Sequence, residues 1–234
     1  MFRLIYLISF LIKNYWRKTH FVIQFFILAV VSGYLFDPRY APYSYQYIVL
    51  VKNITMIIIS YLTVYQLNKK SYNRSIYVLL NRVKRSWYYL GSVFSSAIIV
   101  LFLSLLLDIY ILIFTGLSFF DLFNLSLIFY SISNILLTIL IANLFSLYTI
   151  MGKYQVIGFL LIGFGSIPDW YVSLPLEKTF YYLSYLLPSL GKNILLQQEK
   201  IFLSWTMFWS LIYMIFILII GIRRFNRRNL VDLK

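Results

Sequence analysis

The chain alternates long apolar runs with short polar breaks, several of which contain proline. A helix needs about 20 mostly apolar residues to cross the hydrocarbon of a bilayer. Six runs are candidate spans, and the fifth is stopped by Pro168 and Asp169 before it can cross fully upright. They cover roughly residues 21–36, 47–67, 88–117, 122–150, 154–167 and 201–222. The pattern predicts an all-α polytopic membrane protein, with residues 1–234 forming a single transmembrane domain of six transmembrane helices.

Residues 1–20 show helical periodicity. Tyr15 and Trp16 are residue types that favour the headgroup layer. We expect an amphipathic helix that lies in the membrane interface and enters the first span at an angle. It does not resemble a cleaved signal peptide, because basic residues follow the first apolar run and no small-residue cleavage site appears. The polar positions recur every three or four residues, at Arg3, Tyr6, Ser9, Lys13 and Arg17.

Residues 68–87 form the one long basic segment between two very apolar runs, with six basic residues and no acidic residue. Within it, apolar residues recur at helical spacing and predict an apolar stripe on a basic helix. Such a helix cannot sit in lipid. It either lies on the membrane surface, anchored to anionic lipid, or docks its stripe into a groove on a partner. The stripe consists of Ile76, Leu79, Leu80 and Val83.

Residues 169–200 are too apolar for a free loop and too broken for a clean span. The interruptions are Pro175, Glu177, Lys178 and Pro188. Irregular backbone at membrane depth is tolerated only where protein or water covers it. The pattern therefore predicts short re-entrant helices on the outer face, before the last span.

Composition and charge support this membrane assignment. The chain is 62% hydrophobic and only 12% charged, whereas a soluble domain carries about 25% charged residues. The net charge of +14 fits the rule that basic residues flank spans on the cytoplasmic side, so nucleic acid is not an expected partner. Basic residues gather before the first span, in residues 68–87 and in the tail, which places both termini in the cytoplasm. Frequent Ile, Tyr, Phe, Asn and Lys suggest an AT-rich genome and a bacterial plasma membrane, that is, the inner membrane.

Catalytic and metal-binding chemistry finds little support in the sequence. There is no cysteine, and His20 is the only histidine. Neither thiolate chemistry nor a metal cluster is indicated. The phosphate-binding loop of P-loop ATPases is also missing, because Gly152-Lys153 is followed by Tyr154, and Gly191-Lys192 by Asn193. We expect a chain that is not an enzyme and binds no metal or cofactor itself.

Polar residues inside the spans have two interpretations. They could line a translocation path, or they could pack helices together through hydrogen bonds in lipid. The candidates are Asn53, Ser60 and Thr63 on the second span, and Ser131, Asn134 and Thr138 on the fourth. Asp108 is the only acid well inside a span and is therefore a functional candidate, with Lys52 as its natural partner.

The predicted fifth span contains three glycines, Gly158, Gly163 and Gly165. Glycine allows two helices to approach closely, which suits a dimer interface. It also permits a kink before Pro168. Both interpretations of these glycines remain open.

Two local motifs complete the pattern. Residues 78–98, VLLNRVKRSWYYLGSVFSSAI, contain a two-leucine segment, a short polar stretch, an arginine and a Tyr/Leu-Gly pair that leads into the third span. These places are filled by Leu79, Leu80, Arg85, Tyr89, Leu90 and Gly91. Residues 182–189, YLSYLLPS, place a proline before the last span. Together with the layout of the whole chain, these motifs resemble the permease subunit of ABC transporters of the ABC-2 type, the exporter class. The chain departs from that pattern at Lys69, Lys70 and Asn73, where an acidic residue and a Gly-Thr pair often stand.

The resemblance implies that residues 68–87 are a coupling helix that inserts into a cleft on an ATP-hydrolysing subunit. The apolar stripe would dock there, with Arg82 and Arg85 at its rim. The ATPase would be a separate chain that holds ATP and Mg²⁺. A homodimer or close heterodimer of permeases would then move cargo outward. The apolar, aromatic spans favour an amphipathic or lipid-like cargo, with an amphipathic peptide as the first choice.

Two other classes of protein remain open. One is a secondary carrier or channel that needs no ATPase, for which Asp108 would be the coupling residue. The other is a membrane anchor or assembly factor without a transport role. A P-loop ATPase encoded in the adjacent reading frame would favour the exporter over both.

Overall fold

The protein is all-helical over the residues that the computed structural model describes, which are 2–17, 20–35, 45–68, 83–115, 124–146, 155–166, 190–198 and 204–227. These residues form eight helices and contain no strand. The helices are α1 (Phe2–Arg17), α2 (His20–Leu35), α3 (Tyr45–Leu67), α5 (Arg85–Thr115), α7 (Leu125–Leu144), α8 (Gln155–Ser166), α10 (Leu190–Gln198) and α11 (Trp205–Arg227). The predicted all-α fold is confirmed for this part of the chain.

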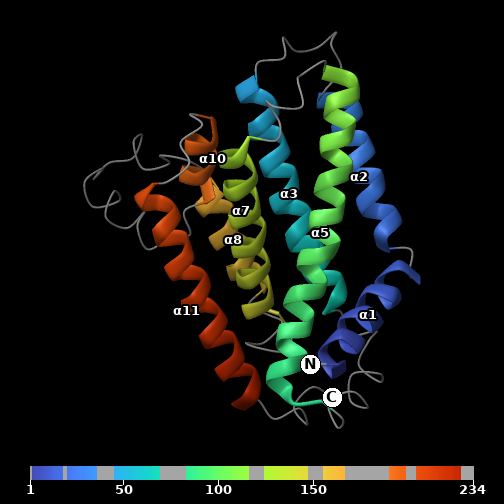
Figure 1. Cartoon of the computed structure of the whole chain (residues 1–234), viewed down its shortest axis with the longest axis vertical. Coiled ribbons are helices and arrows are strands. Elements are labelled where there is room, and N and C mark those ends of the chain that lie inside the picture. Colours follow the sequence, from blue (N-terminus) through green and yellow to red (C-terminus); the bar gives the residue numbers. More distant parts are fainter. Residues whose placement is uncertain are drawn as a thin grey trace.

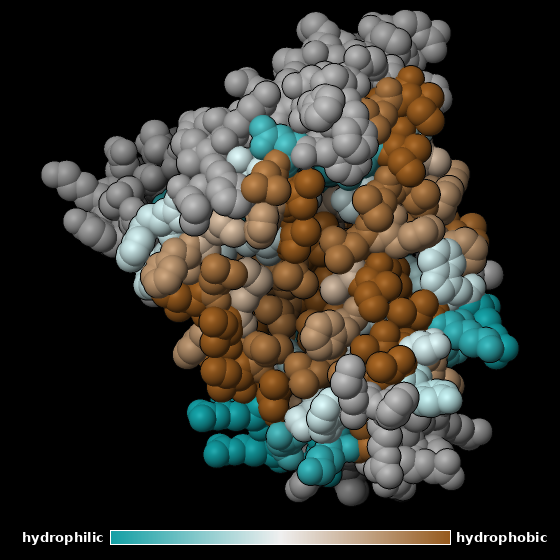
Figure 2. Space-filling view, viewed as in Figure 1, coloured by the Kyte–Doolittle hydropathy of each residue, from teal (hydrophilic) through white to brown (hydrophobic). Residues whose placement is uncertain are grey.

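Four of these helices, α3, α5, α7 and α11, are long and apolar enough to cross a membrane. They run lengthwise through the bundle, with α11 at one edge and α2 at the other (Figure 1). Their apolar side chains form a broad band on the face shown in Figure 2, with hydrophilic residues below it. We call that lower end the basic end, because it carries Lys84, Arg85, Arg223, Arg224 and Arg227. This arrangement is that of a multi-pass membrane protein.

Helix α7 lies at the centre of the bundle. It packs against α3, α5, α8, α10 and α11, and most of its residues are buried. The side chain of Asn124 caps its first turn by accepting a hydrogen bond from the backbone N–H of Ser126 at 3.1 Å. Its other end is Leu144, where the Phe145 N–H donates back to the Ile141 carbonyl. The predicted span over 122–150 was therefore too long, because apolar composition alone does not reveal where a helix ends.

The other predicted boundaries shift by a few residues. Helix α5 begins at Arg85 rather than at residue 88. Helix α11 begins at Trp205 rather than at 201, and continues to Arg227 instead of ending before the arginines. Basic side chains are favourable in the last turn of a helix, because they interact with its exposed carbonyl groups. The arginines therefore extend α11 and do not stop it.

Two apolar helices are shorter than a span requires. Helix α2 has 16 residues and α8 has 12, which correspond to roughly 24 Å and 18 Å at 1.5 Å per residue. The hydrocarbon layer is about 30 Å thick. The helices α2 and α8 match the first and fifth predicted spans in position. Among the described residues, four helices are long and apolar enough to cross a membrane, and six spans stay a prediction.

Helix α1 is amphipathic in the way the sequence predicts. Tyr6, Ser9, Lys13 and Arg17 are all exposed. On the opposite side, Leu7, Leu11 and Tyr15 are buried, and the helix packs along α5 and meets α2 at an angle (Figure 1). Its close approach to α5 depends on Gly91, where a Cβ atom would lie 2.6 Å from the Cδ2 atom of Leu7.

Two predicted features fall outside the described residues. The coupling segment is described only at its edges, at residue 68 and residues 83–87. Of the predicted re-entrant region, only residues 190–198 are described, as α10. Helix α10 packs against α7, α3 and α8 near the end of the bundle opposite the basic end (Figure 1).

Candidate functional site

A buried ion pair joins α3 and α5. The Nζ atom of Lys52 lies 2.5 Å from Oδ1 of Asp108, and the two side chains are 5% and 10% exposed. Asp108 is the only acidic residue among those described. Opposite charges at this depth neutralise each other and avoid the cost of a lone charge in an apolar environment. The sequence predicted both candidates, and the structure brings them into contact.

A second polar contact joins three helices in the half of the bundle away from the basic end. The side-chain amide of Asn193 on α10 donates to Asn134 Oδ1 on α7 at 2.9 Å and to Ser210 Oγ on α11 at 3.1 Å. The amide of Asn134 reaches the Leu190 carbonyl at 3.4 Å. All three side chains are buried. This cluster, which we call the Asn193 cluster, holds the short helix α10 inside the bundle.

A third contact lies at the basic end, where α3 and α7 end and α5 begins. Asn68 Nδ2 and Ser92 Oγ each donate to Asn143 Oδ1 at 3.1 Å. Asn143 Nδ2 donates to the Ile139 carbonyl at 2.9 Å. We call Asn68, Ser92 and Asn143 the Asn68 cluster. Asn68 is the first residue of the predicted coupling segment, so this cluster ties that end of the segment to α5 and α7.

A fourth cluster links α1, α2 and α3 through the fully buried Gln24. Its amide donates to Thr63 Oγ1 at 3.0 Å and to Gln66 Oε1 at 3.3 Å. The Tyr15 hydroxyl donates to Gln24 Oε1. Of these residues, only Thr63 was among the site residues predicted from the sequence. One signal was present, because Gln24 is the only polar side chain between His20 and Ser32 in the first apolar run.

The predicted path residues are all buried, but most bond within the protein. Asn53, Ser60 and Thr63 donate to the carbonyl groups of Val49, Met56 and Ile59 on their own helix, at 2.8, 2.6 and 2.8 Å. Thr63 also bonds towards α2, whereas Asn134 bonds towards α10 and α11. The interhelical contacts of Thr63 and Asn134 act in helix packing, whereas the bonds to carbonyl groups four residues earlier stay within α3. Ser131 and Thr138 are buried on α7, and a path through these residues stays a prediction.

The structure describes only two of the six predicted docking residues, Val83 and Arg85. Ile76, Leu79, Leu80 and Arg82 lie outside the described residues. Val83 is half-buried against the core. Arg85 Nη1 donates to the carbonyl oxygen of Asn226 in the last turn of α11 at 3.0 Å. The far end of the coupling segment is therefore also tied to a long helix.

The three glycines of α8 have different surroundings. A Cβ atom at Gly158 would lie 2.8 Å from the Cβ atom of Phe145, so this glycine allows α8 to approach the end of α7. A Cβ atom at Gly163 would meet nothing within 4 Å. Gly165 is buried. Gly158 thus has a packing role within the chain, whereas Gly163 leaves an open surface on a helix whose Phe159 is also exposed. Their role in a dimer interface stays a prediction.

The described residues contain no group of three or more His, Cys, Asp or Glu side chains that could hold a metal ion. The polar sites are instead an ion pair and three hydrogen-bonded clusters at helix contacts. No family model, curated protein or solved structure matches the chain.

Proposed function

We propose that this chain is the permease subunit of an ATP-driven exporter of the ABC-2 type. It has no catalytic chemistry of its own in this proposal. Two permease copies, identical or closely related, associate with separate ATPase subunits that bind ATP and Mg²⁺. The chain lies in a bacterial plasma membrane, with both termini and the basic end on the cytoplasmic side.

The attachment of the predicted coupling segment carries the proposal. At the start of the segment, Asn68 is bonded to Asn143 on α7 and lies next to Ser92 on α5. Near its end, Arg85 is bonded to the end of α11. A displacement of the segment would therefore reach α3, α5, α7 and α11 together. A coupling helix needs such attachment, because nucleotide-driven movement of an ATPase has to reach several spans at once.

The layout of the bundle gives further support. Helix α1 is amphipathic, and it meets α2 at an angle. The predicted coupling segment leaves and re-enters the bundle at the basic end, which positive residues mark as the cytoplasmic side. In the proposed exporter, α2 and α8 are the first and fifth of six spans, and residues 169–200 form re-entrant helices on the outer face.

The absence of cysteine in the chain makes this topology directly testable. Single cysteines at Ser71, Ser118 and Ser173 would be labelled with a membrane-impermeant maleimide in intact cells. We expect labelling at residues 118 and 173 and protection at 71. Labelling at 71, or protection at 118, would contradict the proposed arrangement of spans.

The cargo proposed for this exporter is amphipathic or hydrophobic, with an amphipathic peptide as the first choice. The spans are rich in aromatic and aliphatic side chains. Among the described residues, the only charged side chains buried within α3, α5, α7 and α11 are Lys52 and Asp108, which neutralise each other. Such an interior offers little to a small inorganic ion, which needs charged or carbonyl ligands along its path.

The test of this function is ATP hydrolysis by a P-loop ATPase encoded in the adjacent reading frame, reconstituted in nanodiscs with and without this chain. We expect hydrolysis to increase with the wild-type chain and to return to the basal rate with Leu79→Asp plus Leu80→Asp. An ATPase that responds to neither chain would contradict the exporter proposal.

One observation favours a second candidate, a secondary carrier. Ionisable groups inside a membrane often belong to ion pathways, and Lys52 with Asp108 is such a pair. Proteoliposomes that contain this chain alone would test the carrier. Uptake of an amphipathic dye that is driven by a proton gradient, and is lost in a folded Lys52→Met plus Asp108→Leu variant, would favour the carrier. No uptake without an ATPase would exclude carrier activity towards that dye.

A further inference from the structure

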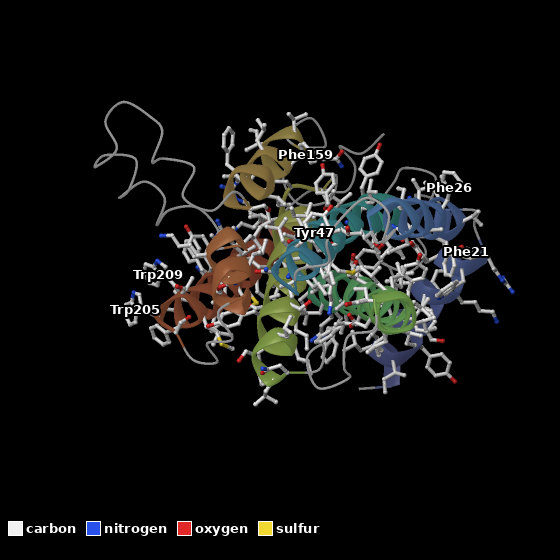
Figure 3. All side chains as sticks on the ribbon, turned by 90° about the horizontal axis from the view of Figure 1, so that it is seen from above. Phe21, Phe26, Tyr47, Phe159, Trp205 and Trp209 are labelled. Carbon is white, nitrogen blue, oxygen red and sulfur yellow. The ribbon has the colours of Figure 1, made fainter. Side chains whose placement is uncertain are left out.

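Helix α11 presents a long apolar face that the rest of the chain does not cover. It is the least buried of the four long helices. Its inward face is narrow and consists of Ser210, Ile217, Gly221 and Phe225. Figure 3 shows Trp205 and Trp209 of this helix at the outer edge of the bundle. The exposed apolar side chains are Phe208, Leu211, Ile212, Ile215, Phe216 and Ile219.

This face continues into arginines at the basic end. Ile212, Phe216, Ile219, Arg223 and Arg227 follow one another at spacings of three or four residues, so they share one side of the helix. Arg223, Arg224 and Arg227 are all exposed. The same surface therefore changes from hydrocarbon-like to cationic within one helical turn.

The length of this face matches a bilayer. At 1.5 Å per residue, the rise from Trp205 to Arg223 is about 27 Å, close to the ~30 Å of the hydrocarbon layer. At the other end, Trp205 stacks on Trp209 with ring centroids 6.3 Å apart and lies 5.3 Å from Phe208. Such aromatic groups mark a membrane interface. The arginines then lie at the level of the lipid headgroups in the opposite leaflet.

The arginine-bearing turn is held in place by α5. The Phe225 ring stacks on Tyr88 at 5.9 Å and packs against Tyr89 at 6.1 Å. Gly221 leaves room for the Tyr89 ring, which would collide with any larger residue. Arg85 donates to the Asn226 carbonyl. These contacts prevent the last turn from fraying, so the three guanidinium groups start from a fixed backbone.

The charge of this turn is not balanced by the described part of the chain. Three cations on adjacent positions repel one another. The only acidic residue among those described, Asp108, pairs with Lys52 in the other half of α5. Arginine binds phosphate through two parallel hydrogen bonds. Anionic headgroups of the cytoplasmic leaflet attract basic residues at this level.

We propose that the last two turns of α11 form a binding site for one anionic phospholipid of the leaflet at the basic end. Arg223 and Arg227 bind the phosphate, with Arg224 beside them. The acyl chains lie along Ile212, Phe216 and Ile219. This inference requires that α11 spans the membrane, and it does not rest on the proposed transport function.

The test uses the full chain in nanodiscs made from equal parts phosphatidylglycerol and phosphatidylcholine. Native mass spectrometry after release counts the lipids of each class that stay bound. We expect the preference for phosphatidylglycerol to fall about fivefold or more in the triple variant Arg223→Gln plus Arg224→Gln plus Arg227→Gln. Each basic residue near an anionic surface increases binding by about fivefold, so the loss of even one contact would lower the preference by that amount. The matched control, Lys13→Gln plus Arg17→Gln plus Lys84→Gln, removes the same charge elsewhere and should keep most of the preference.

An equal loss in the two triple variants would overturn the proposal, because general attraction to a basic protein would then explain the preference. A second variant guards against failed insertion. Arg-to-Lys replacement at all three positions keeps the charge and the orientation signal but removes bidentate binding. We expect it to lower the preference at least about twofold. If both arginine variants retain the wild-type preference, no lipid is bound there, and an acidic protein surface becomes the occupant to test.

Discussion

Lys52 on α3 and Asp108 on α5 form an ion pair inside the apolar bundle, with 2.5 Å between Nζ and Oδ1. The two residues lie in the half of the bundle away from the basic end, and both are almost fully buried. Each charge neutralises the other, because burying an isolated ion in apolar surroundings costs several kcal/mol of desolvation free energy. The pair fixes how α3 and α5 lie beside each other, whatever further role it has.

Removing one partner of this pair should destabilise the fold more than removing both. Asp108→Asn leaves the Lys52 ammonium buried without its counter-charge, and we expect a loss of about 3–5 kcal/mol in the free energy of unfolding. Lys52→Met plus Asp108→Leu removes both charges and keeps similar volumes, so it should be more stable than either single variant. Thermal unfolding in detergent measures these differences. If the double variant loses as much stability as the two single variants together, the interaction between Lys52 and Asp108 does not explain the losses.

The Asn68 cluster should contribute measurably to stability through Asn143. Asn143→Leu removes the acceptor shared by Asn68 and Ser92. With about 0.6–2 kcal/mol for each interhelical hydrogen bond in lipid, we expect a loss of roughly 1–3 kcal/mol. Ser133→Ala is the matched control on the same helix, because the buried Ser133 hydroxyl has no hydrogen-bond partner among the described residues. Equal effects of the two variants in a thermal unfolding series would contradict the assigned role of the cluster.

Two glycines of α8 should respond differently to the same change. Gly158→Ala places a methyl group against the Cβ atom of Phe145, which can move only with its backbone, so we expect a loss of about 1–3 kcal/mol. Gly163→Ala meets open space and should be neutral, or slightly stabilising because alanine favours helix. If Gly163→Ala instead weakens self-association in analytical ultracentrifugation without lowering stability, it supports the dimer interface, one of the two interpretations of these glycines.

Tyr89 and Gly221 form a contact between α5 and α11 that permits a rescue experiment. A Cβ atom at Gly221 would collide with the Tyr89 hydroxyl group, which has no hydrogen-bond partner among the described residues. We expect Gly221→Ala to destabilise the fold by about 1–3 kcal/mol. Tyr89→Phe alone should cost little, and in combination it should recover part of the loss. Absence of any recovery would mean that the ring, and not the hydroxyl, sets the distance between these helices.

The sequence predicted the all-α membrane fold because the spans are long and their apolar character does not depend on tertiary contacts. It also predicted the exposed side of α1 and the burial of Leu7 and Leu11 opposite it. Tyr15, which the sequence assigned to the headgroup layer, is instead buried against Gln24. Helix ends were harder to predict. The end of α7 at Leu144 lies within the mostly apolar residues 135–151, where neither glycine nor proline marks it.

Contacts between helices could be predicted only where chemistry limited the choice. Asp108 had one natural partner, Lys52, because few charges occur inside the spans. The Gln24 and Asn193 clusters depend on which helices are neighbours, and on how each is rotated. For a residue such as Asn134, the sequence therefore indicated a hydrogen bond between helices but not the residue that would form it. The exposed arginine group on α11 was visible in sequence only as a basic tail.

The central claim, that residues 68–87 dock onto an ATPase, is tested most directly by co-purification from detergent with the ATPase encoded in the adjacent reading frame. Leu79→Asp plus Leu80→Asp places two carboxylates on the predicted docking stripe. Val78→Asp plus Asn81→Asp is the matched control, because it places the same charges on the opposite face of the predicted helix. We predict that the wild-type and control chains retain the ATPase and that the stripe variant loses it while still inserting into the membrane. Equal behaviour of all three chains, or no binding at all, would contradict the exporter account and favour a basic helix that rests on the lipid surface.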